Sequence, residues 1–339
     1  MADNPLVSVK MITYNQASYI TQAIEGVLSQ KSDFPFELVI GEDCSTDGTR
    51  EIVLRYAEAH PDIIRVVSSE RNVGTRVNSR RTTEACRGKY IAWCEGDDYW
   101  HRDDKLQLQV AYLEAHDECT LVHSDCDFYV ESAATSFPSW DSRRGLASPE
   151  TATVAALLRG EFAIRTCTAC ARLEIVRELY ASDWESYGLD RRFRMGDTQL
   201  WAGLISRGKT HYIPESLATY RILPESASRS RSYVLQQRFY RSAVDLRLQL
   251  ARKHGLPESE VTHYKQKLAH QDLVLALLTA DKQLGETGYR SLEAPTLRHK
   301  LLFLASRNVL LNRIVRLAWR VKRRFYTWRH QRYGFGEVR

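Results

Sequence analysis

Acidic residues in this sequence stand at positions and spacings that suit chemistry on a charged substrate. Asp43 follows an apolar, β-branched run and leads into the turn Ser45-Thr46-Asp47-Gly48. Glu95 and Asp97 follow another such run with one glycine between them, and Asp98 comes next. Two carboxylates at this spacing can surround one cation, and Mg²⁺ or Mn²⁺ takes oxygen ligands from one or two carboxylates together with substrate phosphates. Such a cation would stabilise a departing diphosphate.

Asp197 lies much further along the chain, directly after Gly196 and at the start of a helical pattern, Thr198–Ser206. Taken alone, this position is that of a helix N-cap. Taken alone, the acids at 95–98 would form a solvated turn. The case for a shared site comes from the elements on which these acids stand.

Runs rich in β-branched residues alternate with helical apolar spacing up to residue 94, which predicts an α/β fold with a mixed, mostly parallel sheet. In such sheets, ligands bind beyond the carboxyl ends of the strands. Three expected strands end in polar clusters, at 13–15, 42–43 and 95–98, so we expect these clusters to meet at one edge. The expected strands are Leu6–Thr13, Phe36–Ile40, Ile63–Val67 and Tyr90–Cys94, and the expected helices are Ala17–Gln30, Thr49–Ala59 and Ser79–Ala85.

The regular alternation stops after these elements. Short strands are expected at Thr120–His123, Phe128–Val130 and His211–Ile213, and a mobile loop at Ser132–Ser148. From residue 233 the pattern is helical. The sequence therefore predicts an α/β domain over 1–232, a helical extension and linker over 233–297, and a basic helical tail over 298–339.

The chain has 339 residues and a net charge of +6, and its positive charge is concentrated in the tail. Residues 298–339 contain 12 Lys and Arg and one acidic residue, a net of +11, so residues 1–297 carry −5. Apolar side chains recur in the tail at helical spacing beside several arginines. This stripe suits the interface of an anionic membrane, and docking on the chain's own catalytic domain or on a second protomer explains it equally well. The stripe consists of Leu310, Ile314, Leu317, Val321, Phe325 and Trp328.

Compartment signals favour the cytoplasm. The N-terminus lacks the basic and apolar regions of a signal peptide, and no run of 18 apolar residues occurs. Seven cysteines, an odd number, are typical of reduced thiols, and the single Cys167-Thr-Ala-Cys170 motif lacks two further ligands for a metal site. The body carries no nucleic-acid-binding motif.

Four stretches together carry a resemblance to a known family. They read VSVKMITYNQASYITQAIEGVLSQ, ELVIGEDCSTDGT, GKYIAWCEGDDYW and GDTQLW, with an NVG…N segment at Asn72–Asn78 between the second and the third. In this order, over roughly residues 5–232, they resemble the inverting glycosyltransferases of family 2. The resemblance implies the GT-A fold, a nucleotide-binding α/β half joined to an acceptor-binding half, here followed by a helical extension.

The resemblance also implies roles for individual residues. Glu95-Gly96-Asp97 takes the place of the family's DxD motif, so Asp97 would be the ligand of Mg²⁺ or Mn²⁺ and Asp98 would support the donor sugar or its loop. Asp197 would be the general base that takes the proton of the acceptor hydroxyl. Trp201 would line the acceptor site, and a core tryptophan explains it equally well. The implied nucleotide-binding residues are Thr13, Tyr14, Asn15, Glu42, Asp43 and Glu95.

The sequence departs from the family pattern at one place. Many relatives carry a metal-binding His after a Tyr-Arg pair, whereas this chain reads Thr219-Tyr-Arg-Ile-Leu-Pro224, with Leu223 near that place. We therefore expect the metal to be held by Asp97, the diphosphate and water, and to bind weakly without the donor.

The expected function is that of a metal-dependent hexosyltransferase that moves a sugar from a nucleotide-sugar, with a UDP-sugar favoured, to a glycan or lipid-linked acceptor. The resemblance implies work on cell-surface polysaccharide at the inner face of the plasma membrane, with peripheral contact through 298–339. A homo-oligomer is compatible with the sequence. Two alternatives remain open: a sugar nucleotidyltransferase, and a non-catalytic membrane-associated assembly module. Against the first, the initial strand ends in Thr13-Tyr-Asn-Gln16 rather than in a glycine-rich phosphate loop.

Overall fold

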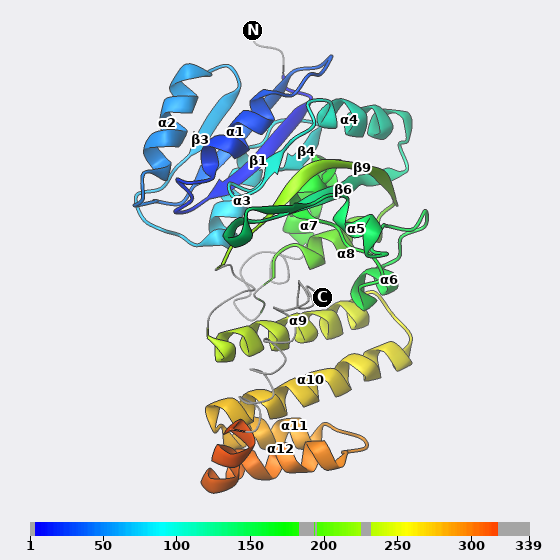
Figure 1. Ribbon diagram of the computed structural model, residues 1–339. Helices are drawn as coiled ribbons and strands as arrows, with labels where there is room; N and C mark the ends of the chain where they lie inside the picture. The colour runs from blue at the N-terminus through cyan, green and yellow to red at the C-terminus, as the bar shows by residue number, and fades with distance from the viewer. Residues whose placement is uncertain (1–3, 183–192, 194, 225–231, 318–339) are drawn as a thin grey trace. The chain divides into compact units, whose positions relative to one another are not determined.

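A computed structural model of the chain describes residues 4–182, 193, 195–224 and 232–317 (Figure 1). The chain divides into two compact units, Met1–Pro224 and Glu225–Arg339. The first unit contains a nine-stranded sheet flanked by helices, and the second contains helices α9 to α12. The sequence places the corresponding boundary at residue 232.

The first four strands of the sheet form a parallel block in the order β3-β2-β1-β4. Helices cover this block, so β1 is buried along almost its whole length and lacks the alternating pattern of a half-exposed strand. The predicted parallel α/β core is therefore confirmed. Its elements are β1 (Val7–Thr13), α1 (Ile20–Leu28), β2 (Phe36–Glu42), α2 (Thr49–Ala59), β3 (Ile64–Val67), α3 (Thr75–Ala85) and β4 (Tyr90–Trp93).

The remaining strands turn the sheet into a mixed one, in the order β4-β8-β6-β9-β5, with β7 beside β6. Only the β6–β9 pairing in this half is parallel, but it is the longest pairing in the sheet, whereas each antiparallel pairing is short. The expectation of a mixed, mostly parallel sheet is therefore confirmed. The strands of this half are β5 (Tyr99–Trp100), β6 (Cys119–Val130), β7 (Thr135–Phe137), β8 (Cys170–Arg172) and β9 (Lys209–Ile222). The helices are α4 (Lys105–Ala115), α5 (Trp140–Arg143), α6 (Val154–Arg159), α7 (Leu173–Ser182) and α8 (Thr198–Ile205), with short 3₁₀ turns at Glu131–Ala133 and Thr166–Thr168.

The segment Ser132–Ser148, expected as a mobile loop, contains β7 and α5. Trp140 is buried and stacks on Phe128 with ring centroids 4.6 Å apart. The neighbouring Asp141 is buried, and Nη2 of the partly exposed Arg165 donates to it at 2.6 Å. These two contacts hold the segment against β6. They could not be predicted from the sequence, because the segment is mostly polar.

All seven cysteines are free, and Cys167 and Cys170 are buried. Burial raises the pKa of both thiols, so they are protonated and inert at neutral pH. The CxxC motif is thus part of the core, as the lack of further ligands in the sequence predicts.

The second unit is built on two long helices, α9 (Tyr233–Lys253) and α10 (Glu258–Thr279), followed by α11 (Lys282–Arg290) and α12 (Leu297–Arg307). Its apolar core joins α10 to α12 through Leu273, Leu277 and Leu302. Residues 309–317 are again helical. Among the described helices, none combines the length and the apolar character that crossing a bilayer requires.

Candidate active site

The carboxyl ends of β1, β2 and β4 lie side by side, with β1 in the middle. Thr13, the last residue of β1, is opposite Glu42, the last residue of β2. On the other side of β1, the Gly96 amide donates to the Ile12 carbonyl at 3.2 Å. The three polar clusters that the sequence predicts at strand ends therefore meet at one edge of the sheet.

The segment after β1 is tied to the loop after β2. Asn15 has a φ of 53°, a left-handed conformation that asparagine adopts more readily than most residues. Its Oδ1 accepts the Thr46 amide at 2.8 Å, and its own amide donates to Ser45 Oγ at 3.0 Å. Tyr14 directly precedes the anchored Asn15. Its side chain is 47% exposed and so accessible to a ligand.

Glu42 and Asp43 are both buried, and each holds a different loop. Glu42 accepts the Ser45 amide at 2.6 Å and pairs with Arg50 at 2.6 Å. Burial alone would raise the pKa of Glu42, but these partners lower it overall. Asp43 accepts the two amides of Val73–Gly74 at 2.8 and 2.9 Å. Glu42 thus fixes the loop after β2 through Ser45 and Arg50, while Asp43 fixes the segment that leads into α3.

The turn after β4 gathers negative charge. The pKa of Glu95 is raised to about 7, first by burial and then by the charges of Asp97 and Asp197, against the opposing charge of Lys10. Burial likewise raises the pKa of Asp97. Crowded, partly desolvated carboxylates are destabilised as anions, and a divalent cation relieves that cost. The donor set of hard oxygens fits Mg²⁺ or Mn²⁺.

Gly96 lets this turn lie directly against the loop after β1. A Cβ at Gly96 would stand 2.4 Å from Gln16 Oε1 and 2.9 Å from Thr13 Oγ1. The Thr13 hydroxyl donates to Gln16 Oε1 at 2.8 Å, and the Gln16 side chain hydrogen-bonds Asp97, which partly offsets the rise in pKa of that carboxyl. Close packing against Gln16 and Thr13 therefore favours glycine between the two acids.

Asp197 joins this cluster from far away in the sequence. It is the N-cap of α8, and its Oδ1 accepts the Thr198 amide at 2.7 Å. Its charge contributes to the raised pKa of Glu95, so the two carboxylates share one electrostatic environment. The N-cap role and a role in the site are thus compatible, because a helix N-terminus also favours a negative charge.

Arg221 of β9 fixes the acidic turn, and the sequence reasoning did not assign it a role. Its Nε donates to the Asp97 carbonyl at 2.9 Å, and its amide donates to Asp98 Oδ1 at 2.8 Å. Its Nη1 pairs with Glu131, and its guanidinium lies about 5 Å from the ring of Tyr19. Asp98 is accordingly buried within the turn. The signal in the sequence is a single arginine within the otherwise uncharged run 217–223.

Three further residues take structural positions. Trp201 is 2% exposed and packs edge-on against Trp93, with centroids 5.4 Å apart, which is the geometry of a core tryptophan. Arg81 donates to the Ser68 carbonyl and to Asn78. Leu223 directly follows β9, where it supplies no ligand atom for a metal.

Within the described ranges, one group of three His, Cys, Asp or Glu side chains has ligand atoms within 4.8 Å of one another: Asp125, Cys126 and Asp141. Arg165 already donates to both oxygens of Asp141, at 2.6 and 3.1 Å, and Asp125 accepts the Asp141 amide. The guanidinium supplies the positive charge, so this cluster joins β6 to α5. The turn at 95–98 offers a cation one or two carboxylates, which suits an ion shared with a diphosphate and water.

A mixed sheet with polar strand ends at one edge and an acidic turn after β4 is the arrangement expected of a GT-A glycosyltransferase. The chain belongs to glycosyl transferase family 2, whose model matches residues 8–176, and the protein is a glycosyltransferase. Its relative TuaG of Bacillus subtilis, named for teichuronic acid biosynthesis, is 30% identical over 229 residues, which are 67% of this chain and 83% of TuaG. The uncharacterised protein Rv1520 of Mycobacterium tuberculosis is 32% identical over 265 residues, 75% of this chain and 70% of the relative.

Solved structures share the fold. Residues 1–349 of Staphylococcus aureus TarS, in complex with UDP-GlcNAc, give a TM-score of 0.57 at 19% identity, covering 88% of this chain and 79% of that one. The mannosyltransferase PcManGT of Pyrobaculum calidifontis, in complex with GDP-Man and Mn²⁺, gives 0.54 at 18% identity, covering 93% and 87%. The predicted GT-A fold and family are confirmed, and the nucleotidyltransferase and non-catalytic alternatives fall away.

Proposed function

We propose that this glycosyltransferase inverts the anomeric centre of a nucleotide-sugar, preferably a UDP-sugar, while transferring the sugar to a hydroxyl of a glycan or lipid-linked acceptor. The nucleotide would lie at the edge formed by β1 and β2, against Tyr14 and Asn15 and over Asp43. Glu95 would face the ribose or a metal-bound water. Glu42 would act through the loop that it shapes.

Asp97 would hold Mg²⁺ or Mn²⁺ together with the diphosphate, with Asp98 and Arg221 keeping the turn in place. The bound cation supplies charge stabilisation to the leaving diphosphate. Gln16 and Gly96 set the position of the Asp97 carboxylate. With Leu223 in place of a histidine, the protein provides few ligands, so metal affinity would depend on the donor.

Asp197 would accept the proton of the attacking hydroxyl. The acceptor oxygen forms a bond to the anomeric carbon while the bond from that carbon to the diphosphate oxygen breaks, and the nucleoside diphosphate leaves with the electron pair. The proton ends on the Asp197 carboxylate. One displacement inverts the configuration and needs no enzyme nucleophile. Trp201 would support α8 behind this base rather than contact the acceptor.

The observation that carries this proposal is the meeting of the polar ends of β1, β2 and β4 at one edge of the sheet. The charge of Asp197 acts on Glu95 in the turn after β4, which supports a place for Asp197 at the same edge. The named ligands of TarS and PcManGT, UDP-GlcNAc and GDP-Man with Mn²⁺, support a nucleotide-sugar donor and a divalent metal. The name of TuaG supports a role in surface polysaccharide biosynthesis.

A thermal-shift screen with UDP-GlcNAc, UDP-glucose and GDP-mannose, each with and without Mn²⁺, tests the donor assignment. A ligand that binds only the folded state raises the melting temperature. We expect a UDP-sugar with Mn²⁺ to stabilise wild type, and Asp97→Ala to remove the metal-dependent part. Asp104→Ala, at the half-exposed N-cap of α4, serves as the matched control. Equal stabilisation of wild type and Asp97→Ala by the donor and Mn²⁺ would contradict the proposal.

The tail would bring the enzyme to the inner face of the plasma membrane. In the described part of the stripe, Leu310, Ile314 and Leu317 are 69%, 57% and 62% exposed. Arg313 and Arg316 lie on the same helical segment. Exposed apolar side chains beside arginines suit an anionic bilayer surface. The remaining stripe residues, Val321, Phe325 and Trp328, lie outside the described residues.

Co-sedimentation of the full chain with phosphatidylglycerol vesicles and with phosphatidylcholine vesicles tests this attachment. We expect binding to the anionic vesicles, reduced several-fold by the double substitution Leu310→Gln with Ile314→Gln. Leu54→Gln, at an exposed leucine of α2, is the control and should bind as wild type does. Vesicle binding that the double substitution leaves unchanged, or an absence of binding by wild type, would contradict attachment through this stripe.

A further inference from the structure

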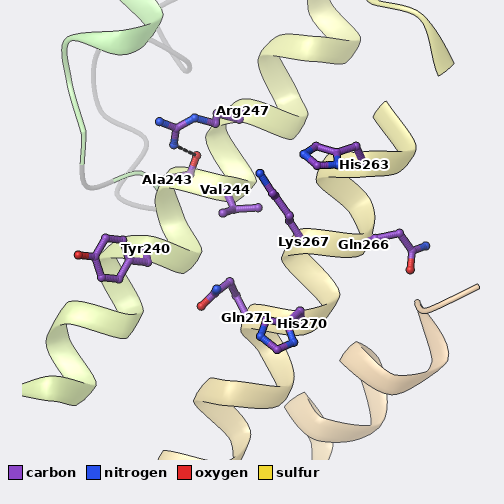
Figure 2. A pocket seen from close by; sticks show the side chains of 9 residues that line it. All are labelled: Tyr240, Ala243, Val244, Arg247, His263, Gln266, Lys267, His270 and Gln271. Carbon is purple, nitrogen blue, oxygen red and sulfur yellow. Dashed lines mark hydrogen bonds between the residues drawn. The ribbon is translucent and has the colours of Figure 1, made fainter. Parts of the chain in front are cut away.

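Helices α9 and α10 of the second unit line a cavity of about 500 Å³, a volume that suits a ligand of sugar size. Figure 2 shows its lining, with the Lys267 side chain extending from α10 into the space between the helices and Arg247 and Val244 on the α9 side. Two cations, two imidazoles and two carboxamides contribute to the lining, which holds no carboxylate. They are Arg247, Lys267, His263, His270, Gln266 and Gln271.

Lys267 is the cation of this cavity whose charge is available to a ligand. Among the described residues, no carboxylate pairs with Lys267, whose ammonium lies 5.9 Å from the centroid of the Tyr264 ring. Asp272 of α10 pairs instead with Arg241. Glu258 pairs with Lys265 at 2.9 Å.

His270, at one end of the cavity, is a neutral imidazole at pH 7. Its pKa is lowered to about 4, first by burial and then by Arg298 and His299. It is held by His299, with Nδ1 and Nε2 3.2 Å apart. His270 adds no charge of its own, so the charge of Lys267 and a lining without carboxylates leave the cavity suited to an anion.

Gln271 presents a buried acceptor atom that needs a hydrogen-bond donor, which a simple anion does not provide. Its Oε1 is buried and has no hydrogen-bond partner among the described residues. A buried acceptor without a donor is costly, and a ligand hydroxyl would satisfy it. The cavity therefore offers cationic donors for a negative group and an acceptor for a hydroxyl.

We propose that the cavity between α9 and α10 binds an anionic sugar, one that carries a phosphate or a carboxylate beside free hydroxyls. The ammonium of Lys267 would contact the anionic group, and the Gln271 Oε1 would accept a hydrogen bond from a hydroxyl. This gives the helical unit a carbohydrate-binding function of its own, separate from the transfer site in the first unit. It would retain acidic glycan chains on the enzyme.

Isothermal titration calorimetry of the full chain tests the site with glucose 6-phosphate, glucuronate, inorganic phosphate and glucose. We expect glucose 6-phosphate or glucuronate to bind and glucose to show no binding; whichever anion binds more tightly identifies the negative group. Lys267→Gln should weaken binding by about tenfold or more, as expected for a lost charged hydrogen bond. Lys265→Gln, on the same helix and outside the cavity, should stay within about twofold of wild type.

Gln271→Leu separates an anionic sugar from a bare anion. It should weaken glucose 6-phosphate severalfold and leave inorganic phosphate unchanged. Equal losses in Lys267→Gln and Lys265→Gln would overturn the site, because they would show general charge attraction, and so would an absence of binding by both sugar anions. The nucleotide-sugar thermal shift of Lys267→Gln should equal that of wild type, so failure here leaves the transferase proposal intact.

Discussion

Replacing Arg221 with methionine should loosen the turn that carries Asp97. The guanidinium is almost fully buried and donates to the Asp97 carbonyl, to Gln22 and to Glu131. Removing one partner of a buried pair costs about 3–5 kcal/mol, and because Glu131 is 33% exposed the lower value, about 3 kcal/mol, applies. At about 2–4 °C per kcal/mol for a unit of this size, the melting temperature should fall by about 6–12 °C.

Scanning calorimetry measures that shift, and donor kinetics measure its effect on the site. A displacement of the turn by about 1 Å should lower kcat/KM by about 100-fold. Arg221→Lys keeps the charge but not the planar fork of donors, so it should restore only part of both values. Arg102→Met removes an exposed arginine paired with Asp104 and should shift the melting temperature by about 2 °C or less. If the melting temperature of Arg221→Met falls no further than that of Arg102→Met, the proposed role of Arg221 in holding the turn is wrong.

Three other changes follow from the same contacts. Gly96→Ala should push Gln16 away from Asp97 and lower donor affinity by about tenfold or more in a binding titration, while an unchanged affinity would contradict the close packing. Chelation by EDTA should abolish transfer, and calorimetry should detect tight Mn²⁺ binding only when nucleotide is present; tight binding to the free protein would indicate a missed ligand. Burial alone would raise the pKa of Glu37, but Ser8 and its other partners lower that pKa overall. The ionised Glu37 therefore stabilises the folded protein above the unfolded-state pKa of 4.5, and this stabilisation is lost as the pH falls through the lower folded-state pKa. Urea denaturation of Glu37→Gln should therefore show a weaker loss of unfolding free energy below about pH 4.5 than wild type, and parallel curves would refute this.

The parallel half of the fold could be predicted because its signals are local. Strand and helix periods alternate cleanly there, and the expected helix Thr49–Ala59 has the same bounds as α2. The second half resisted prediction because its strands β5, β7 and β8 have two or three residues, too few to show a period. In β9 only His211–Ile213 was expected, because Pro214 interrupts the pattern at a bulge between the Ile213 and Ser216 pairings with β6.

The candidate site likewise has features that could be predicted from the sequence and features that could not. Positions at strand ends could be read from the sequence, so Thr13, Glu42 and the acids of the turn after β4 lie together at the predicted edge. Which of these side chains is free to meet a ligand depends on loops that pack only in the folded chain. The Glu42 carboxylate, for example, is already bonded to Ser45 and Arg50 in the folded chain. The burial of Trp201 likewise depends on a tertiary contact with Trp93. Their assigned roles in the site stay predictions.

The transfer rate of Asp197→Asn, measured with the donor that most stabilises wild type, tests the central claim most directly. Asparagine caps a helix as well as aspartate does, so α8 and the fold should be retained, and donor binding should stay within about twofold. An amide cannot accept the acceptor proton, so kcat should fall by about 10²–10⁴-fold. Transfer at the wild-type rate by Asp197→Asn would contradict the assignment of Asp197 as the base.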